Sequence, residues 1–302
     1  GGFYAEKVLA PLGADVSSSQ FLEPDGSFPN HIPNPEDKSA IESICAKVRE
    51  AKTDLGLIFD TDVDRVSAVD ESAKEINRNA IVALAAALIA DSHPGSTVVT
   101  DSVTSRGLTA FLEGSLGLKH LRFKRGYRNV INKSIELNEQ GIESNLAIET
   151  SGHAAYKENF FLDDGAYLAT KIVIATAKCK NAGKGISSLI SDLSEPLESQ
   201  EVRLPIKGSN FAAVGDNIIE DLRALSSSGE LSECSLEEPN YEGVRINFNS
   251  PSIKGWMLLR KSLHEPIMPL NFESDVKGGC LKIAKLLIPL LSKYENLDIG
   301  KL

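Results

Sequence analysis

Three aspartates stand at alternate positions directly after an apolar run, in the stretch DLGLIFDTDVDR (54–65). Without a positive partner, the carboxylates of Asp60, Asp62 and Asp64 would repel one another, because a charged neighbour of the same sign disfavours ionisation. Hard carboxylate oxygens gathered at one point are the ligands that Mg²⁺ and Ca²⁺ prefer. The spacing therefore predicts a divalent cation site, and a solvated acidic turn is the plain alternative.

Two other protein classes share part of this spacing. The aspartates match the first ligands of an EF-hand, but Arg65 stands where that loop requires glycine and the flanks are strand-like, so we reject it. A haloacid dehalogenase-like phosphohydrolase also has an apolar strand that ends in Asp-x-Asp. Under that hypothesis Asp60 is the nucleophile, and FLDDG (161–165) supplies a later acidic pair.

The elements that must position these side chains follow an α/β pattern. Between residues 76 and 190, strand-like stretches alternate with helix-like stretches of 10 to 15 residues, which predicts a parallel sheet. In such sheets functional side chains gather at the carboxyl ends of the strands. Four polar residues follow predicted strand ends: Asp60, Asp101, Lys124 and Glu149.

Changes of pattern along the chain predict three domains. Residues 1–75 form a partial α/β domain that contains the aspartate loop, and residues 76–190 form a second α/β domain. A polar stretch (187–201) is interpreted as a linker. Residues 200–302 have short strands followed by a closing helix, which predicts a small antiparallel α+β domain. The predicted fold class is therefore α/β, with parallel-sheet domains followed by a small α+β domain.

Composition excludes several function classes. The net charge of −10 argues against a nucleic-acid binder, although the basic cluster 122–128 could hold an anionic substrate. The apolar run 80–90 is too short for a membrane span and is expected to be a buried helix. Four cysteines without a C-x-x-C pair indicate a reducing compartment and no zinc or disulfide framework. We expect a soluble intracellular protein that binds neither nucleic acid nor membrane.

Four stretches together resemble one known superfamily, the α-D-phosphohexomutases, which includes phosphoglucomutase, phosphomannomutase and phosphoglucosamine mutase. DTDVDR (60–65) resembles its metal-binding loop, and PDGSFPNHIPNPED (24–37) resembles the segment that precedes it. ETSGH (149–153), with a later Asp-Asp-Gly, resembles the sugar-recognition loop. GWMLLRKSLHEP (255–266) resembles the phosphate-binding loop. The stretches occur in the family's order and at its spacing.

The resemblance implies a role for each set of residues. Mg²⁺ would be held by the three aspartates against a phosphorylated serine, with Arg65 close by. Sugar hydroxyls would be bound by Glu149 and Ser151, and the phosphate that does not react by Arg260 and Ser262. The remaining catalytic candidates are His153 and Lys124.

Plain structural roles compete with several of these assignments. Glu149 could serve as a helix cap or salt-bridge partner, His153 could donate a hydrogen bond to loop backbone, and Lys124 could be a solvated charge. Asp163 and Asp164 are predicted to start and cap the helix after Gly165.

The sequence also departs from the family pattern. In the family, glycines are common between the aspartates of the metal-binding loop. Small or hydroxyl residues are usual in the phosphate-binding loop, and a second arginine is common after that loop. The residues that differ here are Thr61, Val63, Leu263, His264 and Asn271, with Tyr127 where some members have histidine and Val103 where some have lysine. Fewer phosphate ligands should weaken or alter the grip on phosphate.

No Ser-His-Asn-Pro-like catalytic loop is found in the sequence. The resemblance therefore implies a carboxyl-terminal part of a mutase whose amino-terminal catalytic domain is its partner, and we expect the fragment alone to be inactive. The whole protein would interconvert hexose 1-phosphate and hexose 6-phosphate through a phosphoserine and a bisphosphate intermediate. The alternative is a non-catalytic phosphosugar-binding or scaffold protein with a decayed site. The sequence resembles plant-type members of the family most, so we expect the protein to lie in the cytoplasm or the plastid stroma.

Overall fold

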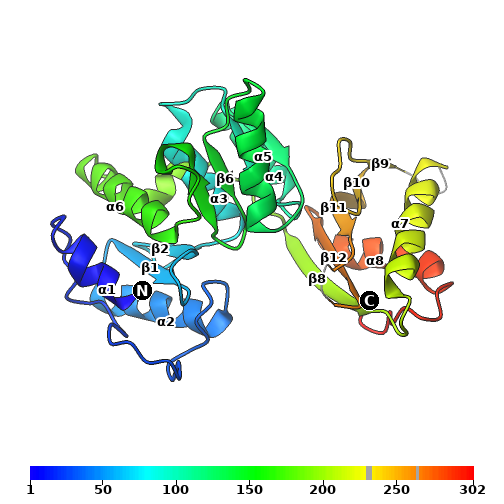
Figure 1. Cartoon of the computed structure of the whole chain (residues 1–302), viewed down its shortest axis with the longest axis horizontal. Coiled ribbons are helices and arrows are strands. Elements are labelled where there is room, and N and C mark those ends of the chain that lie inside the picture. The colour runs from blue at the N-terminus through cyan, green and yellow to red at the C-terminus, as the bar shows by residue number, and fades with distance from the viewer. Residues whose placement is uncertain (229–232, 263–264) are drawn as a thin grey trace. The chain divides into compact units, whose positions relative to one another are not determined.

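The computed structural model describes residues 1–228, 233–262 and 265–302. The chain divides into two compact units by its internal contacts. The first comprises Gly1–Thr104 and Leu108–Leu193, and the second comprises Ser105–Gly107 and Ser194–Leu302. The first unit holds the aspartate loop and most of the two predicted α/β domains. Figure 1 shows the helices and strands of both units with their labels.

The first unit begins with helical segments and a small antiparallel sheet. Its helices are α1 (Gly2–Tyr4), the π-helix η1 (Ala5–Leu9) and α2 (Lys38–Ala51). The sheet has the order β1-β2-β3, with β1 (Leu55–Phe59), β2 (Val66–Asp70) and β3 (Glu75–Ile76). Asp37 caps α2, because its Oδ1 accepts the Ser39 N–H at 2.9 Å. The aspartate loop is the connection between β1 and β2, closed by the pairing of Phe59 with Val66.

A four-stranded sheet forms the rest of the first unit. Its order is β5-β4-β6-β7, with β4 (Thr97–Thr100), β5 (Lys119–Arg122), β6 (Leu146–Ile148) and β7 (Ala154–Tyr156). Strand β4 pairs in parallel with both β5 and β6, so the predicted parallel sheet is confirmed. The edge strand β7 is antiparallel to β6, which the sequence analysis did not predict.

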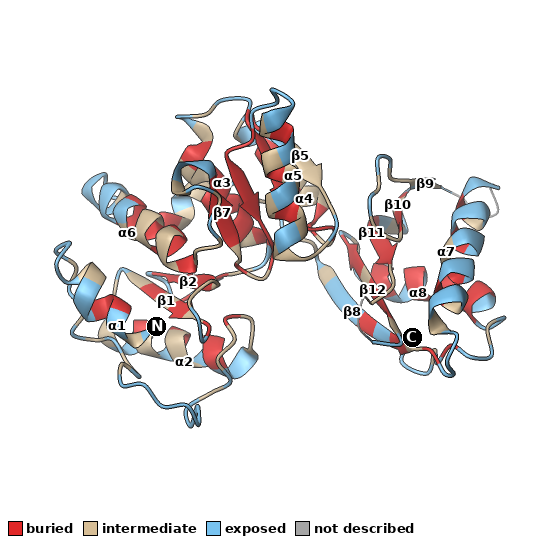
Figure 2. Ribbon diagram, viewed as in Figure 1, coloured by how far each residue is buried: buried red, intermediate tan, exposed pale blue. Residues whose placement is uncertain are grey.

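Helices cover both faces of this sheet. They are α3 (Asn79–Ala90), α4 (Arg106–Ala110) with η2 (Phe111–Ser115), α5 (Tyr127–Glu139), η3 (Lys157–Asn159), α6 (Gly165–Asn181) and η4 (Ile186–Ile190). Alternate residues of β4 face different clusters: Val98 packs with α3 and α6, whereas Val99 packs with Val130 of α5. Figure 2 shows the buried residues concentrated in α3 and in this sheet. The apolar run 80–90 is therefore the buried helix that was predicted.

The second unit is an antiparallel sheet covered by two helices. The strand order is β8-β12-β11-β10-β9. The strands are β8 (Glu198–Pro205), β9 (Cys234–Leu236), β10 (Val244–Ser250), β11 (Ile253–Leu259) and β12 (Ile267–Ser274), and the helices are α7 (Phe211–Ser227) and α8 (Gly279–Leu291). The three central strands and the closing helix agree with the α+β prediction. Helix α7 and strand β8 were missed, and the stretch interpreted as a linker (187–201) contains part of η4 and the start of β8.

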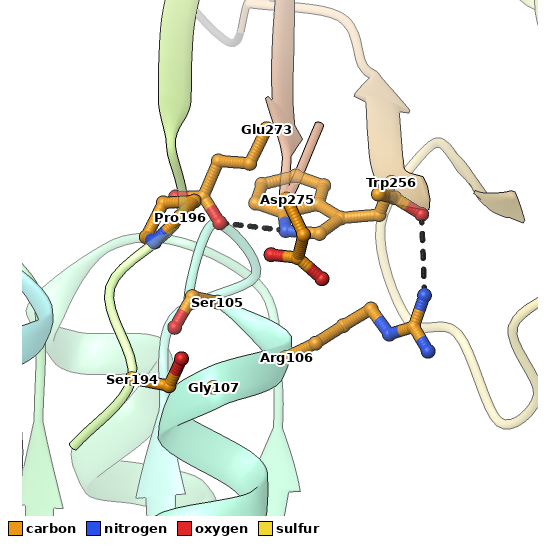
Figure 3. A pocket seen from close by; sticks show the side chains of 9 residues that line it. Ser105, Arg106, Gly107, Ser194, Pro196, Trp256, Glu273 and Asp275 are labelled. Atoms are coloured by element: carbon orange, nitrogen blue, oxygen red, sulfur yellow. Dashed lines mark hydrogen bonds between the residues drawn. The ribbon is translucent and has the colours of Figure 1, made fainter. Parts of the chain in front are cut away.

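A small pocket lies in the second unit (Figure 3). Its lining residues are Ser105, Arg106, Gly107, Ser194, Pro196, Gly255, Trp256, Glu273 and Asp275. The Trp256 Nε1–H donates to Glu273 Oε2 at 2.8 Å, and Arg106 Nη1 donates to the Gly255 carbonyl at 3.5 Å. These bonds join two pairs of lining residues, and the pocket contains none of the predicted site residues. Within the described ranges, no helix is long and apolar enough to cross a membrane.

Candidate active site

The three loop aspartates converge as their spacing predicts. Strand β1 delivers Asp60, which is 5% exposed, while Asp62 is exposed and Asp64 is partly buried. One carboxylate oxygen from each of the three lies within 4.8 Å of the others, which is a spacing that could hold a metal ion. The structure therefore supplies a cluster of hard oxygen ligands on a single short loop.

Arg65 fixes the first of these carboxylates. Its Nε–H donates to Asp60 Oδ2 at 2.7 Å, and its backbone N–H donates to Asp60 Oδ1 at 3.2 Å. Burial by itself would raise the pKa of Asp60, but the hydrogen bonds from Arg65, the hydrogen bond with Asp64 and the Arg65 charge together outweigh burial and hold the pKa below its usual value. Arg65 also donates from Nη1 to Asn34 Oδ1 at 3.4 Å, which ties the Pro-rich segment 24–37 to the loop. Asp60 is thus ionised and held in one orientation.

Asp64 has a different environment. Burial, a hydrogen bond with Asp60 and nearby negative charge raise its pKa to about 6, although the proximity of His153 opposes the rise. Its Oδ1 atom is buried and has no hydrogen-bond partner among the described residues. An orphaned buried acceptor is costly, and a cation beside two further carboxylates would satisfy it. The donor set therefore fits a hard divalent ion.

Val63 gives the loop an unusual backbone. Its φ is +68°, a conformation that is strained for a β-branched residue and that glycine adopts freely. Strain of this kind persists only where neighbours determine the conformation, and it concentrates at functional sites. Gly165, at the start of α6, packs against the loop so closely that a Cβ there would lie 2.9 Å from the Val63 carbonyl oxygen. Val63 thus adopts a backbone conformation that glycine would take more easily, in a loop that packs closely against the start of α6.

The aspartate loop is joined directly to the ETSGH stretch. Arg65 and His153 form an antiparallel β-bridge, and the Val66 N–H donates to the Gly152 carbonyl at 3.3 Å. The approach requires glycine, because Gly152 has φ +96° and a Cβ there would lie 2.5 Å from the Val66 carbonyl oxygen. Two stretches that the sequence analysis assigned to different domains therefore form a single site.

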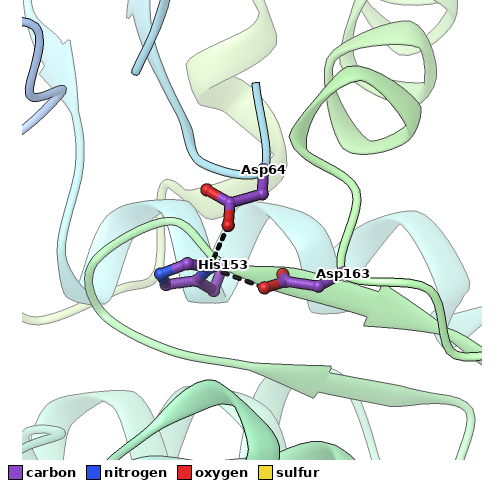
Figure 4. A group of neighbouring side chains, drawn as sticks. All are labelled: Asp64, His153 and Asp163. Atoms are coloured by element: carbon purple, nitrogen blue, oxygen red, sulfur yellow. Dashed lines mark hydrogen bonds and ion pairs between the residues drawn. The ribbon is translucent and has the colours of Figure 1, made fainter. Parts of the chain in front are cut away.

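His153 is held from several sides (Figure 4). Its Nδ1 lies 2.8 Å from Asp163 Oδ2 and 3.6 Å from Asp64 Oδ2, and the Tyr127 ring stacks on it with centroids 5.1 Å apart. Burial favours the neutral ring, but the carboxylates of Asp163, Asp64 and Glu149 outweigh it and raise the pKa of His153. Asp64, His153 and Asp163 form a second group whose atoms could hold a metal ion.

Asp163 corrects one expectation. It was predicted to cap helix α6 together with Asp164, but only Asp164 does so, by accepting the Tyr167 N–H at 2.9 Å. Asp163 instead bonds His153, and its Oδ1 is buried without a hydrogen-bond partner in the part of the chain that the structure describes. The sequence signal for this contact was that Asp163 stands ten residues after His153, which lies in a sharp turn. Periodicity alone does not reveal that the two side chains meet.

Glu149 lies at the carboxyl end of β6 and is 4% exposed. Its Oε1 accepts the Gly126 N–H at 2.7 Å. Burial and the Asp101 carboxylate raise the pKa of Glu149 to about 7, against the opposing effects of the Gly126 bond and the charges of Arg125 and His153. Glu149 is therefore near the midpoint of its titration at neutral pH.

Two further predicted residues of the first unit lie near this edge. Ser151 is partly buried in the turn between Glu149 and His153. Lys124 is exposed, two residues beyond the end of β5. Among the residues that the structure describes, no contact of either side chain identifies its role, so both roles remain predictions.

The predicted phosphate-binding residues belong to the second unit. Arg260 follows β11, and its Nη1 lies 3.8 Å from Glu242 Oε1. The Ser262 N–H donates to the Ile267 carbonyl at 3.0 Å, and Ser262 Oγ accepts the Glu265 N–H at 3.3 Å. The departures at positions 263 and 264 lie outside the described residues.

Two protein-family models together match the first two thirds of the chain. The model for α/β/α domain II of phosphoglucomutase/phosphomannomutase matches residues 1–74, and the model for domain III matches residues 77–197. The chain belongs to the phosphoglucomutase/phosphomannomutase family. This places it in the α-D-phosphohexomutase superfamily, as the motifs predicted, and agrees with the observed mixed α/β fold.

Curated relatives and solved structures agree with this family. A phosphomannomutase/phosphoglucomutase of Pseudomonas aeruginosa is 32% identical over 279 residues, which cover 91% of this chain and 55% of the relative. A phosphoglucomutase of Neisseria gonorrhoeae is 29% identical over 287 residues, covering 94% of this chain and 57% of the relative. A family protein of Burkholderia thailandensis has a similar fold, with TM-score 0.79 at 24% identity, over 99% of this chain and 60% of that one. The chain therefore spans little more than half the length of these relatives.

Proposed function

We propose that this chain is the metal-binding and sugar-binding part of a phosphohexomutase that interconverts hexose 1-phosphate and hexose 6-phosphate. The reaction would pass through a phosphoserine and a hexose bisphosphate. One observation carries the proposal: the β-bridge between Arg65 and His153, which joins the aspartate loop to the ETSGH turn. A site of this kind can place a metal ion and a sugar side by side, and phosphoryl transfer depends mainly on such positioning and on charge neutralisation.

Asp60, Asp62 and Asp64 would hold Mg²⁺, which supplies positive charge that offsets the charge of the transferring phosphoryl group. Arg65 keeps Asp60 ionised and holds its carboxylate in one orientation. The hydrogen bond to Asp163 determines which ring nitrogen of His153 remains for substrate, namely Nε2.

The sugar and the second phosphate would be held by separate groups. Glu149 and Ser151 would bind sugar hydroxyls, while Lys124 would lie beside the reacting phosphate. Arg260 and Ser262 would hold the phosphate that does not react, because a guanidinium matches a phosphate dianion. A substrate that turns around between two half-reactions needs such separate sites.

The phosphorylated serine would come from another domain of the same protein, so the 302-residue chain alone should not catalyse turnover. The absence of paired cysteine motifs agrees with a reducing compartment such as the cytoplasm or the plastid stroma.

The metal site can be tested on the chain itself. Asp62→Asn removes one exposed carboxylate without altering Asp60 or Asp64, so Mg²⁺ affinity measured by calorimetry should fall roughly tenfold. Asp54→Asn, an exposed aspartate whose partner is Lys180, serves as the matched control. Unchanged affinity in the Asp62 variant would place the ion elsewhere.

The reaction requires the full-length protein. Conversion of glucose 1-phosphate to glucose 6-phosphate, dependent on Mg²⁺, is the expected result. Release of free phosphate would instead favour the phosphohydrolase alternative. Both Asp60 oxygens already accept hydrogen bonds from Arg65, which disfavours Asp60 as a nucleophile.

A non-catalytic phosphosugar-binding protein is the second candidate function. It is supported by departures from the catalytic pattern in the phosphate-binding segment: Asn271 stands in place of a second arginine, and the Arg260 guanidinium lies 3.8 Å from the Glu242 carboxylate. Binding of hexose phosphates to the full-length protein without turnover on glucose, mannose or glucosamine phosphates would support it.

A further inference from the structure

Asp101 is a carboxylate that the proposed function leaves without a role. It is 0% exposed and directly follows β4. Thr100 of β4 is paired with Ile148 of β6 in the parallel register, so Asp101 and Glu149 follow neighbouring residues at the same sheet edge. Two carboxylates buried side by side are costly, and such an arrangement persists where specific partners hold it.

One partner of Asp101 lies in the ETSGH turn. Asp101 Oδ2 accepts the Thr150 hydroxyl at 2.8 Å, and Thr150, which is 6% exposed, stands between Glu149 and Ser151. The turn is closed by two backbone bonds, from the Gly152 N–H to the Glu149 carbonyl and from the Glu149 N–H to the His153 carbonyl. The buried Thr150 side chain is thus one anchor that fixes this turn to the sheet.

We propose that Asp101 is a positioning residue of the hexose-recognition turn: by holding Thr150, it sets the direction in which Glu149 and Ser151 face substrate hydroxyls. The inference rests on the proposed function for its sugar ligand, but the anchoring of the turn does not.

The charge of Asp101 adds a second effect on Glu149. The charged or polar groups that act on Glu149 are Asp101 from β4, the Gly126 N–H and Arg125 from the segment before α5, and His153 from the turn. Burial disfavours the ionised carboxylate most, and of these groups only Asp101 adds to that effect. It therefore helps Glu149 to retain a proton near neutral pH, so that Glu149 can donate to one hydroxyl and accept from another.

Three variants separate the hydrogen bond from the charge. Thr150→Val removes the hydroxyl at nearly constant shape, Thr150→Ser keeps it, and Asp101→Asn keeps an acceptor oxygen but removes the charge. Thr176→Val is the matched control, because it deletes another buried threonine hydroxyl, which donates within α6 to the Ile172 carbonyl.

The first readout is amide hydrogen exchange in the 302-residue chain, measured by NMR. In Thr150→Val the amides of Gly126, Glu149 and Gly152 should exchange roughly tenfold faster, whereas Thr150→Ser and Thr176→Val should leave their rates unchanged. In Asp101→Asn the protection should remain, but the pKa of Glu149, followed by its carboxyl ¹³C shift, should fall. Unchanged exchange in Thr150→Val would overturn the inference.

The second readout is affinity for glucose 6-phosphate, measured by titration calorimetry on the full-length protein. Thr150→Val should bind about five- to tenfold more weakly, with Thr150→Ser close to wild type. Faster exchange with unchanged affinity would also overturn the inference, because the turn would then not orient substrate ligands. If the wild type binds no hexose phosphate while the exchange result holds, the proposed function fails and the anchoring of the turn stands.

Discussion

Asp64 is the loop aspartate whose behaviour depends most on pH. Its pKa is raised to about 6, so below that pH the carboxyl carries a proton that a metal ion must displace. We expect the Mg²⁺ affinity of the chain to strengthen as pH rises from 5 to 7, by at most about tenfold per pH unit for one displaced proton. Calorimetric titrations at pH 5, 6 and 7 measure this directly.

The control for this prediction is Asp64→Asn, which removes the titrating group. Its Mg²⁺ affinity should be weaker and nearly independent of pH across the same range. A pH dependence as steep as that of the wild type would assign the proton to another residue.

Arg65 stabilises the folded chain through Asp60. The folded-state pKa of Asp60 is below its unfolded value, so the interaction contributes stability above the unfolded pKa and is lost as pH falls through the folded pKa. Arg65→Met should therefore lower the free energy of unfolding at pH 7, and the difference from wild type should shrink in strong acid. Urea unfolding of both proteins at pH 7 and at pH 3 measures this difference in unfolding free energy. An equal difference at the two pH values would contradict the prediction.

At the residue scale, the sequence predicts ligand types better than partners. The convergence of Asp60, Asp62 and Asp64 follows from their spacing on one short loop, and the structure confirms it. The partnership of Asp163 with His153 could not be predicted, because it depends on a turn geometry that fixes which of two adjacent aspartates faces the helix.

At the scale of elements, the bridge between β2 and the ETSGH turn depends on Gly152. Gly152→Ala adds a Cβ that would lie 2.5 Å from the Val66 carbonyl oxygen, in addition to the cost of positive φ. We expect a loss of about 2–4 kcal/mol in the free energy of unfolding, together with weaker Mg²⁺ binding. Chemical denaturation and calorimetry measure the two effects.

Gly141→Ala provides the comparison for that prediction. Gly141 has φ +78°, but no atom lies within 4 Å of a Cβ at this position. Its substitution should cost only the backbone strain, about 1–2 kcal/mol, and should leave Mg²⁺ binding unchanged. Equal losses in the two variants would show that the close approach at Gly152 is unimportant.

Local patterns predicted most helices and the strands of the parallel sheet, since alternation and helical periodicity are properties of short segments. They did not predict β7, a three-residue strand that is buried throughout and so shows no alternation. Helix α7 was missed because its sequence, FAAVGDNIIEDLRALSS, contains an internal glycine and follows an irregular polar stretch. Tertiary packing overrides such weak local signals.

At the scale of the whole molecule, each unit has its own hydrophobic core. Leu287 of α8 is fully buried in the core of the second unit, whereas the aspartate loop lies entirely in the first. Leu287→Ala should cost about 2–5 kcal/mol in the second unit's unfolding free energy and leave Mg²⁺ affinity unchanged. Thermal unfolding with and without Mg²⁺ measures the stability of the second unit and the Mg²⁺ affinity. A fall in Mg²⁺ affinity in Leu287→Ala would show that metal binding depends on the core of the second unit.

The sequence could reveal that the motifs belong together, through their order and spacing, but not how they meet. The bridge between Arg65 and His153 joins residues that are far apart in the chain, and no periodicity carries that information. The division into three domains also remains a prediction, because packing gathers the first two predicted blocks into one compact unit.

Asp64 belongs to both groups of possible ligands, and this sharing has a consequence for His153. A doubly charged ion seated on the aspartates would neutralise one of the three carboxylates that favour the imidazolium, so loading the loop should lower the pKa of the ring. By reciprocity, acidification that charges the ring should loosen the ion by the same factor. Metal content and imidazole charge would then oppose each other through the shared Asp64 carboxylate.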